Sequence, residues 1–488
     1  MTDFTTYQLI VEIFVYSFVL VAGLCVLSII WMYIGDKLQT KQAIRHNFPV
    51  IGRLRYTFEH WGTFFRPYFF AQDREEMPFN RAQRTWVYRA AKNLDSTAAF
   101  GSSRNLSSPG TIFFANGLYP VLDSEPSQHT TVTVGPETQH PYHCEHFFHI
   151  SAMSYGAISS PAVKALSWGA KIAGSWLNTG EGGLSPYHLE SGCDLIFQIG
   201  TGKFGVRDEN GNLCEKKLAE IAAHPTVKMF EIKLSQGAKP GKGGILPAAK
   251  VTEEISLIRG IPQGHASISP NRFSEIEGHE DLLNLIDRVR NITRKPVGIK
   301  LCVGNPAEIE SLCEAIIKRG PQSAPNFMTI DSGDGGTGAA PMSLIDNVGM
   351  LVYESLPLVA DILTRHGLRE HVKLIASGKL INPVDVAWAL CAGADFVNSA
   401  RGFMFSLGCI QAMQCNKNTC PTGIATHNKR LQAGLNPIDK SQRVAQYAQN
   451  MEKEVETIAH SCGVKHPRLL NRHHARVITC NGRSKPYA

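Results

Sequence analysis

The chain has 488 residues, of which 43% are hydrophobic and 19% charged, and 49 Lys and Arg against 42 Asp and Glu give a net charge of +7. This composition is that of a globular protein and excludes a disordered, collagen-like or polytopic membrane chain. The charge excess is small for this length, so it does not favour binding to nucleic acid.

The N-terminal segment 13–34 is apolar and contains no charged residue. As a helix it would be about 33 Å long, enough to cross the ~30 Å hydrocarbon core of a bilayer, and Trp31 and Tyr33 at its end suit the interface. Acidic residues precede it and basic residues follow it, so the positive-inside rule places the remainder in the cytoplasm. We therefore expect residues 1–35 to be a single-pass anchor in the inner, cytoplasmic membrane. The alternative is a buried core helix.

Residues 36–110 are expected to form an extension with a helix near 80–94. From about residue 145, eight short runs rich in β-branched and aromatic residues alternate with helical or glycine-rich segments. The runs are FHISA (148–152), SWLNT (175–179), LIFQI (195–199), KMFEIKL (228–234), VGIKLCV (297–303), NFMTID (326–331), VKLIAS (372–377) and DFVNSA (395–400).

Strands separated by helices require parallel crossovers, so we predict an α/β fold, a (β/α)8 TIM barrel, over residues 111–430. The segment 235–296 is an insertion in this barrel, and 431–488 is a helical C-terminal extension.

Glycine-rich loops follow nearly every run, and chemistry in such barrels takes place at the C-terminal ends of the strands. The loops Ser377-Gly378-Lys379 and Ser399-Ala400-Arg401-Gly402 lie where barrels commonly bind phosphate through backbone N–H groups, which suits FMN. The alternative is that these glycines only turn the chain. GDGGTG (333–338) matches the dinucleotide pattern, but Ala339-Ala340-Pro341 follows in place of a helix start, so we assign it to a barrel loop.

Charged residues in the loops favour an anionic substrate. Lys203, Lys239 and Arg259 could bind carboxylates. Lys233 and Lys300 belong to strands and point toward the barrel mouth or its core, where a charge requires a partner. Glu181 is a candidate for catalytic assistance, with a solvated loop carboxylate as the alternative.

Three of the twelve cysteines, Cys409, Cys415 and Cys420, fall in one short window after the eighth strand. Thiolates hold iron–sulfur clusters, and three of them favour a [3Fe–4S] centre, or [4Fe–4S] with a further ligand. Zinc with His427, and three unrelated buried cysteines, are the alternatives. A cluster beside a flavin could pass single electrons to it.

Six motifs resemble the FMN-binding synthase region of glutamate synthases, over about residues 100–430. They are SAMSYGAIS (151–159), NTGEGG (178–183), GTGKFGVRD (200–208), QGAKPGKGG (236–244), DGGTGAAP (334–341) and GCIQAMQCNKNTCPTG (408–423). The chain is most similar to short FMN-binding members of that family, which also carry a segment like RHNFPVIGRLRYTFE (45–59).

The resemblance implies an oxidoreductase acting on CH–NH2 donors, with FMN and a [3Fe–4S] cluster on the three cysteines. In such enzymes reduced FMN gives a hydride to 2-iminoglutarate, formed from 2-oxoglutarate and ammonia, to yield L-glutamate. It implies catalytic roles for Glu181, Lys203 and Lys239, and substrate binding by Lys239, Arg259, Gly182 and Ser154. The implied FMN contacts are Ser151, Ala152, Met153, Ser154, Asn178, Thr179, Gln198, Lys300, Gly335, Gly336, Thr337, Ser377, Gly378, Lys379, Ser399, Ala400, Arg401 and Gly402.

Three departures from the large glutamate synthases bear on partners and substrate. Residue 2 is Thr2 rather than a nucleophilic Cys, so we expect no glutaminase domain and an external source of ammonia. No NADPH module is recognisable, so electrons are expected from a ferredoxin, a flavin reductase subunit or a membrane quinone. Ile245 replaces a Gln beside the oxoacid, which favours a different or less polar substrate.

Two other functions are compatible with the sequence. The first is an FMN- and iron–sulfur-dependent dehydrogenase of another amino, oxo or hydroxy acid that passes electrons to a membrane acceptor. The second is a non-catalytic scaffold that recruits a partner at the membrane. A homo-oligomer is compatible with all three.

Overall fold

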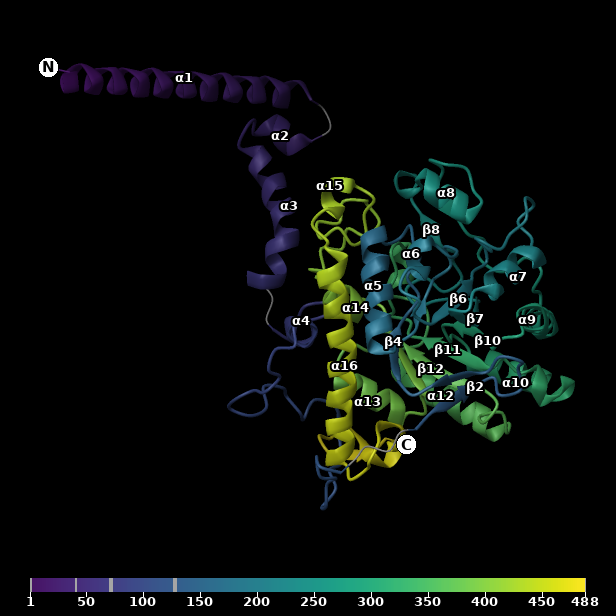
Figure 1. The fold of residues 1–488 in the computed structure, drawn as a ribbon. Helices are drawn as coiled ribbons and strands as arrows, with labels where there is room; N and C mark the ends of the chain where they lie inside the picture. Colours follow the sequence, from purple (N-terminus) through teal and green to yellow (C-terminus); the bar gives the residue numbers. More distant parts are fainter. Residues whose placement is uncertain (1, 40–41, 70–72, 126–129, 488) are drawn as a thin grey trace. The chain divides into compact units, whose positions relative to one another are not determined.

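The computed structural model describes residues 2–39, 42–69, 73–125 and 130–487 (Figure 1). It divides into two units, residues 1–81 and 82–488.

The first unit is helical and comprises α1 (Thr2–Leu38), α2 (Ala43–Asn47) and α3 (Gly52–Phe69). By length and composition, α1 could cross a membrane over Thr6–Leu38, and none of its apolar window is buried in the structure. This exposure does not fit a buried core helix. The membrane and the sidedness of the anchor stay predictions.

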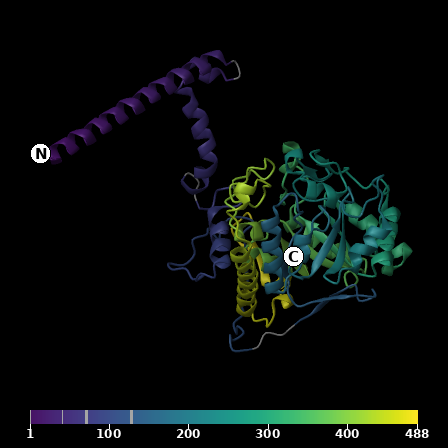
Figure 2. The same cartoon turned by 45° about the horizontal axis from the view of Figure 1, so that its top comes forward.

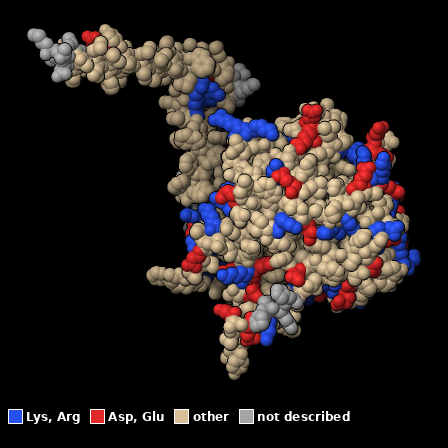
Figure 3. Space-filling view, in the orientation of Figure 1, with Lys and Arg blue, Asp and Glu red and all other residues tan. Residues whose placement is uncertain are grey.

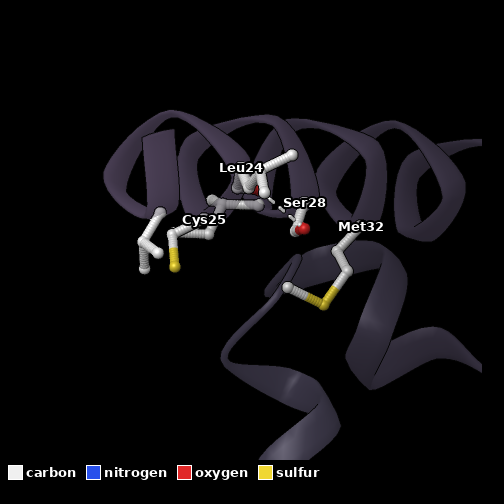
Figure 4. Close-up of a pocket in the computed structure, with 6 residues that line it drawn as sticks. Leu24, Cys25, Ser28 and Met32 are labelled. Carbon is white, nitrogen blue, oxygen red and sulfur yellow. Dashed lines mark hydrogen bonds between the residues drawn. The ribbon is translucent and has the colours of Figure 1, made fainter. Parts of the chain in front are cut away.

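A shallow groove of about 360 Å³ lies along α1 (Figure 4). It is lined by Val21, Leu24, Cys25, Ser28, Ile29 and Met32. The hydroxyl of Ser28 donates a hydrogen bond to the Leu24 carbonyl at 2.8 Å, so this polar group is satisfied within the helix. Such internal bonding makes a hydroxyl tolerable in lipid. The groove is a feature of the helix surface and carries no chemistry of its own.

A buried carboxylate connects the three helices of this unit. Asp36, near the end of α1, accepts hydrogen bonds from Arg45 Nε of α2 and Arg53 Nε of α3, both at 2.8 Å. The backbone N–H of Val50 donates to the same carboxylate at 2.9 Å. One acidic residue therefore holds the beginning of α3 at the end of α1.

The second unit contains the closed parallel barrel. Its strands are β4 (Phe148–Ile150), β5 (Leu177–Asn178), β6 (Leu195–Ile199), β7 (Val227–Lys233), β10 (Val297–Leu301), β11 (Phe327–Asp331), β12 (Lys373–Ser377) and β13 (Phe396–Ser399). Each strand pairs in parallel with the next, and β13 pairs with β4 to close the ring. The eight strands are the eight predicted runs, so the (β/α)8 barrel is confirmed.

Helices lie between and around the strands (Figures 1 and 2). They are α4 (Arg81–Ala91), α5 (Ser160–Ala173), α6 (Pro186–Leu189), α7 (Glu215–Ala223), α9 (His279–Thr293), α10 (Pro306–Arg319), α11 (Met342–Ile345), α12 (Val352–Arg365), α13 (Pro383–Cys391), α14 (Arg401–Ser406), α15 (Lys429–Gln432) and α16 (Pro437–Ser461). The predicted insertion after β7 contains a two-stranded ribbon, β8 (Ile245–Leu246) with β9 (Ser267–Ile268), and α8 (Glu253–Arg259).

Helix α5 illustrates how the sequence sets the limits and packing of an element. The Ser159 side chain accepts a hydrogen bond from the backbone of Ala162 at the first turn, and Gly174 ends the helix with φ 70°. Helix α16 packs against α5. A Cβ added at Gly169 would overlap the Val444 side chain, so this glycine permits the close approach of the two helices.

Apolar side chains fill the end of the barrel where the strands begin. The antiparallel pair β2 (Val132–Val134) and β3 (Tyr142–Cys144) contributes to this cluster. Its largest members include Tyr142, Trp176, Phe327 and Phe396, the last two being the first residues of β11 and β13. A packed floor leaves the opposite end, where the strands finish, available for chemistry.

The C-terminal extension differs in part from the expectation of a helical segment. After α16 the chain forms β14 (Ala475–Ile478) and β15 (Ser484–Pro486), which join β1 (Ile112–Phe114) in a three-stranded sheet. Each strand is only three or four residues long. β14 pairs with the distant β1 as well as with the neighbouring β15, and strands this short show no periodicity that would indicate them.

We predict that Phe327→Ala lowers the free energy of unfolding by about 3–5 kcal/mol, because it opens a cavity in the barrel floor. Urea denaturation followed by near-ultraviolet circular dichroism measures the change. Phe100→Ala is the matched control, since Phe100 is exposed and should shift stability by less than about 0.5 kcal/mol. Equal effects of the two substitutions would contradict the packed floor.

Candidate active site

The predicted site residues lie at or just after the C-terminal ends of the barrel strands. Around the mouth they are Ser151, Ala152, Met153 and Ser154 after β4, Asn178, Thr179, Glu181 and Gly182 at β5, Gln198 and Lys203 at β6, Lys239 after β7, Lys300 in β10, Gly335, Gly336 and Thr337 after β11, Ser377, Gly378 and Lys379 at β12, and Ser399, Ala400, Arg401 and Gly402 at β13. Their individual roles remain predictions.

A buried group of opposite charges occupies this mouth. Lys233, the last residue of β7, places Nζ 3.1 Å from Glu181 Oε1, and the Glu181 side chain is only 14% exposed. Lys239 and Arg259 are buried and interact electrostatically with the same carboxylate. Three positive charges against one negative charge leave a surplus of two, in a site largely shielded from water.

The protonation states of the group follow from burial and from these neighbours. Burial opposes ionisation of Glu181, but Lys233, Lys239 and Arg259 outweigh it, and the net effect is a lowered pKa. Burial, with the positive charge of Lys233, lowers the pKa of Lys239 to about 8. Burial also lowers the pKa of Arg259 to about 10. At neutral pH Glu181 is therefore ionised, and Lys239 and Arg259 are charged.

Two glycines make room for the carboxylate. A Cβ at Gly200 would lie 2.6 Å from Glu181 Oε2, and a Cβ at Gly244 would overlap Oε1. These glycines of the GTGKFG and QGAKPGKGG segments thus serve a steric purpose as well as a conformational one.

Arg259 reaches the mouth from α8, in the insertion, rather than from a barrel strand. Its guanidinium donates to Ser267 Oγ at 3.1 Å and to the Tyr155 carbonyl at 3.2 Å, and it lies over the Phe204 ring. Its buried Nε has no hydrogen-bond partner among the described residues. A buried cation with an unpaired N–H is suited to a carboxylate ligand.

Lys203 has a carboxylate partner of its own. Its Nζ lies 2.9 Å from Glu275 Oε1 and above the Phe273 ring. The side chain is buried. This ion pair neutralises the positive charge that was expected to bind a substrate carboxylate. Lys203 is therefore less available for substrate binding than Lys239 or Arg259.

A second charged group lies at the β11, β12 and β13 ends. Asp334 Oδ2 is 2.9 Å from Lys379 Nζ, and Arg401 Nη2 donates to the Asp334 carbonyl at 3.1 Å. Gly378 has φ 120°, a conformation that favours glycine. Small residues with two cations around one carboxylate are compatible with a phosphate at this position, as the sequence predicted.

Below the mouth lies a polar network that sequence reasoning missed. Glu231 of β7 is buried and accepts hydrogen bonds from Asn178 Nδ2 and Gln198 Nε2 at 3.1 Å. Burial raises the pKa of Glu231, although Lys300 opposes this. Glu231 precedes Lys233 by two positions, so it shares the inward face of the strand, and this spacing could have revealed it.

Lys300 retains hydrogen-bonding capacity toward the mouth. It is buried, and its Nζ lies 3.8 Å from Asp331 Oδ2, beyond a strong hydrogen bond. Asp331 accepts instead from the backbone N–H of Gly237 at 2.9 Å. A buried lysine whose Nζ donates no hydrogen bond within the described part of the chain fits a bound polar group.

The three cysteines share one electrostatic environment. Burial, reinforced by Cys415 and Cys420, raises the pKa of Cys409 to about 12. Burial and the neighbouring Cys420 likewise raise the pKa of Cys415. Lys250 is buried within electrostatic reach of Cys415 and Cys420. The three predicted thiols therefore lie within electrostatic reach of one another.

His427, the further ligand in the zinc alternative, has a backbone partner in the same region. His427 Nε2 is hydrogen-bonded with the Gly156 carbonyl at 2.8 Å. Within the ranges that the structure describes, no three His, Cys, Asp or Glu side chains are arranged to hold a single metal ion.

Comparison with known proteins identifies the family. Residues 115–465 match the family model described as the conserved region in glutamate synthase. The chain belongs to the glutamate synthase family. It is accordingly an oxidoreductase of the class that acts on CH–NH2 donors.

Relatives of several lengths share this region. The glutamate synthase large subunit-like protein YerD of Bacillus subtilis is 39% identical, and the alignment covers 91% of this chain and 91% of its own. The archaeal-type glutamate synthase (NADPH) of Dehalococcoides mccartyi is 34% identical over 67% of this chain and 63% of its own. The glutamate synthase (NADPH) large chain of B. subtilis is 34% identical over 58% of this chain and 18% of its own.

Among solved structures, the recombinant flavin-binding domain of baker's yeast flavocytochrome b2 is 15% identical, with a TM-score of 0.45. The alignment covers 89% of this chain and 88% of that chain. This similarity is too low to bear on function.

We predict that dicarboxylate binding by this glutamate synthase family member weakens above pH 8. Lys239 is charged below its pKa of about 8 and loses its charge above it, so affinity for 2-oxoglutarate should fall by up to tenfold per pH unit there. Isothermal titration calorimetry between pH 7 and pH 9.5 measures this. Lys239→Arg, which stays charged, should flatten the profile, and an equal decline in that variant would contradict the assignment.

Proposed function

We propose that this family member is a membrane-attached, FMN- and iron–sulfur-dependent oxidoreductase that converts 2-oxoglutarate and ammonia into L-glutamate. The proposal rests chiefly on the surplus of two buried positive charges around Glu181. A dianion restores neutrality, and a dicarboxylate does so with groups that bind Arg and Lys well.

Different residues of the barrel mouth would bind different groups of such a substrate. Arg259, whose buried Nε has no hydrogen-bond partner in the ranges that the structure describes, supplies planar donors for one carboxylate. Lys239 supplies a point charge from the loop after β7, and its Nζ donates a hydrogen bond to the backbone carbonyl of Ala339 at 3.1 Å. The substrate would thereby be held in one orientation at the barrel mouth.

Glu181 acts on the nitrogen end of the substrate in this proposal. Because its pKa is lowered, it remains ionised, and Lys233 fixes its position. An ionised carboxylate stabilises a protonated imine nearby, and a protonated imine is a better hydride acceptor than a neutral one. Burial excludes the water that would hydrolyse the imine.

The mouth also fits FMN. The glycine-rich ends of β12 and β13, with Lys379 and Arg401, suit its phosphate. Lys300 and Gln198 suit polar atoms of its ring, and Glu231 orients the Gln198 amide. Bound there, FMN would supply the hydride for reduction of the imine.

In this proposal the three thiols would hold an iron–sulfur cluster. Buried thiols with raised pKa values are costly to ionise alone, and iron removes that cost because it binds the thiolate directly. We place a [3Fe–4S] cluster on Cys409, Cys415 and Cys420, where it would relay electrons from a ferredoxin or a flavin reductase subunit. Ammonia would come from solution or from a partner.

A second candidate keeps the cofactors but changes the acid. Ile245 of β8 belongs to the ribbon whose other strand carries Ser267, the hydrogen-bond partner of Arg259. An apolar side chain beside the acid site favours a less polar substrate. With α1 as an anchor, such a dehydrogenase could reduce a membrane quinone, which a quinone analogue and a panel of amino and hydroxy acids would reveal.

We predict that Arg259→Gln raises the KM for 2-oxoglutarate by about 10²-fold, because a buried charge contact with substrate is worth about 2–5 kcal/mol. Glutamate formation from 2-oxoglutarate and ammonium, with reduced methyl viologen as electron source, measures this. Arg272→Gln is the control, since Arg272 is exposed in the same insertion. A wild-type enzyme that holds flavin and makes no glutamate would favour the second candidate.

We predict that Cys415→Ser removes most of the iron and acid-labile sulfide of the purified protein, whereas Cys480→Ser leaves both unchanged because Cys480 is an exposed residue outside the trio. Colorimetric iron and sulfide analysis, with electron paramagnetic resonance of the oxidised protein, measures the loss. Equal metal content in the two variants would remove the cluster from the proposal.

A further inference from the structure

Helix α3 carries an exposed apolar face. Leu54, Phe58, Trp61, Phe65 and Phe69 recur every three or four residues, so they lie on one side of the helix. Their exposed fractions range from 47% to 72%. A continuous apolar stripe of this size on a helix surface indicates an interaction site.

The aromatic members of the stripe contact one another along the helix. Phe58 and Trp61 meet edge to face with ring centroids 6.1 Å apart, and Trp61 and Phe65 do so at 6.3 Å. Phe65 continues to Phe69 at 5.7 Å. Beside this row, Arg55 and Glu59 form an exposed ion pair at 3.2 Å. The helix is therefore amphipathic, with aromatic rings on one face and charges at its edge.

The hydrogen bonds of Asp36 with Arg45, Val50 and Arg53 hold the beginning of α3 at the end of α1. Besides its bonds to Asp36, Arg53 in the first turn of α3 approaches the Met32 carbonyl of α1, with Nη2 at 3.4 Å. Figures 1 and 2 both show α3 turned away from the axis of α1, neither continuing it nor folding back along it. If α1 crosses a bilayer, α3 starts at the bilayer surface and extends along that surface.

The charges at this junction suit a lipid surface. Figure 3 shows Lys and Arg gathered where α1 ends, whereas the rest of α1 is almost without charge. Lys37, Arg45 and Arg53 outnumber Asp36, so the junction is net positive and complements anionic headgroups. Aromatic side chains, Trp above all, favour the interface between headgroups and acyl chains.

We propose that α3 lies in the lipid interface, with its aromatic face buried between the headgroups and the acyl chains and its charged edge in water. This inference rests on the proposed membrane attachment through α1. It adds a second, interfacial contact that holds the chain against the bilayer beside the anchor. A second copy of the chain or another protein surface would be the competing occupant of the same face.

Quenching of Trp61 by brominated lipids tests this proposal. The full-length protein is reconstituted into vesicles of phosphatidylcholine and phosphatidylglycerol brominated near the headgroup end of the acyl chain, and lipid-dependent quenching of tryptophan fluorescence is measured. Trp31 and Trp61 are the two tryptophans of residues 1–81, so Trp61→Phe should reduce the quenching by about half. Trp388→Phe, which replaces a buried tryptophan of the other unit, should leave it unchanged.

The outcomes separate the two claims. Protein that floats with the vesicles, but shows the same quenching with and without Trp61, overturns the interfacial position of α3 and leaves the anchor intact. Protein that does not float with the vesicles overturns membrane attachment and this inference together.

Discussion

A surplus of buried positive charge at the barrel mouth is the constraint on which the active site depends. Lys233, Lys239 and Arg259 surround Glu181 in a region of low exposure. Burying unbalanced charge is unfavourable, so the surrounding structure must hold these groups until an anion neutralises them. The filled barrel floor and the glycines that admit the Glu181 carboxylate provide that support. Charge balance thus links the fold to the kind of molecule the site accepts.

Much of this architecture was readable from local sequence. Short β-branched and aromatic runs predicted all eight strands because parallel barrel strands are buried on both sides and read as continuous apolar segments. The glycine-rich loops after these strands predicted the position of the active site at the barrel mouth, because the backbone must turn closely around a ligand there. Lys239 could be selected because it is a basic residue inside such a loop, whereas Arg259 lies on α8 and was selected for its charge and through the family resemblance.

Features that depend on contacts between distant segments could not be predicted from the sequence. Glu231 binds Asn178 and Gln198 from two other strands, and only the closed barrel brings them together. Lys203 was expected to face substrate, but Glu275, seventy-two residues later, pairs with it. The β1–β14–β15 sheet joins the beginning and the end of the second unit, and strands of three or four residues have no periodicity to detect.

The origin of Arg259 has an evolutionary consequence. Arg259 lies on α8 and donates a hydrogen bond to Ser267 of β9, and both elements belong to the segment inserted between two barrel strands. In contrast, Lys233, Lys300 and Glu231 belong to the strands themselves. Mutations, or exchange of that segment, can therefore reshape which acid is preferred without disturbing the eight-stranded framework. Related proteins could in this way evolve different substrate preferences while keeping the same barrel and the same redox chemistry.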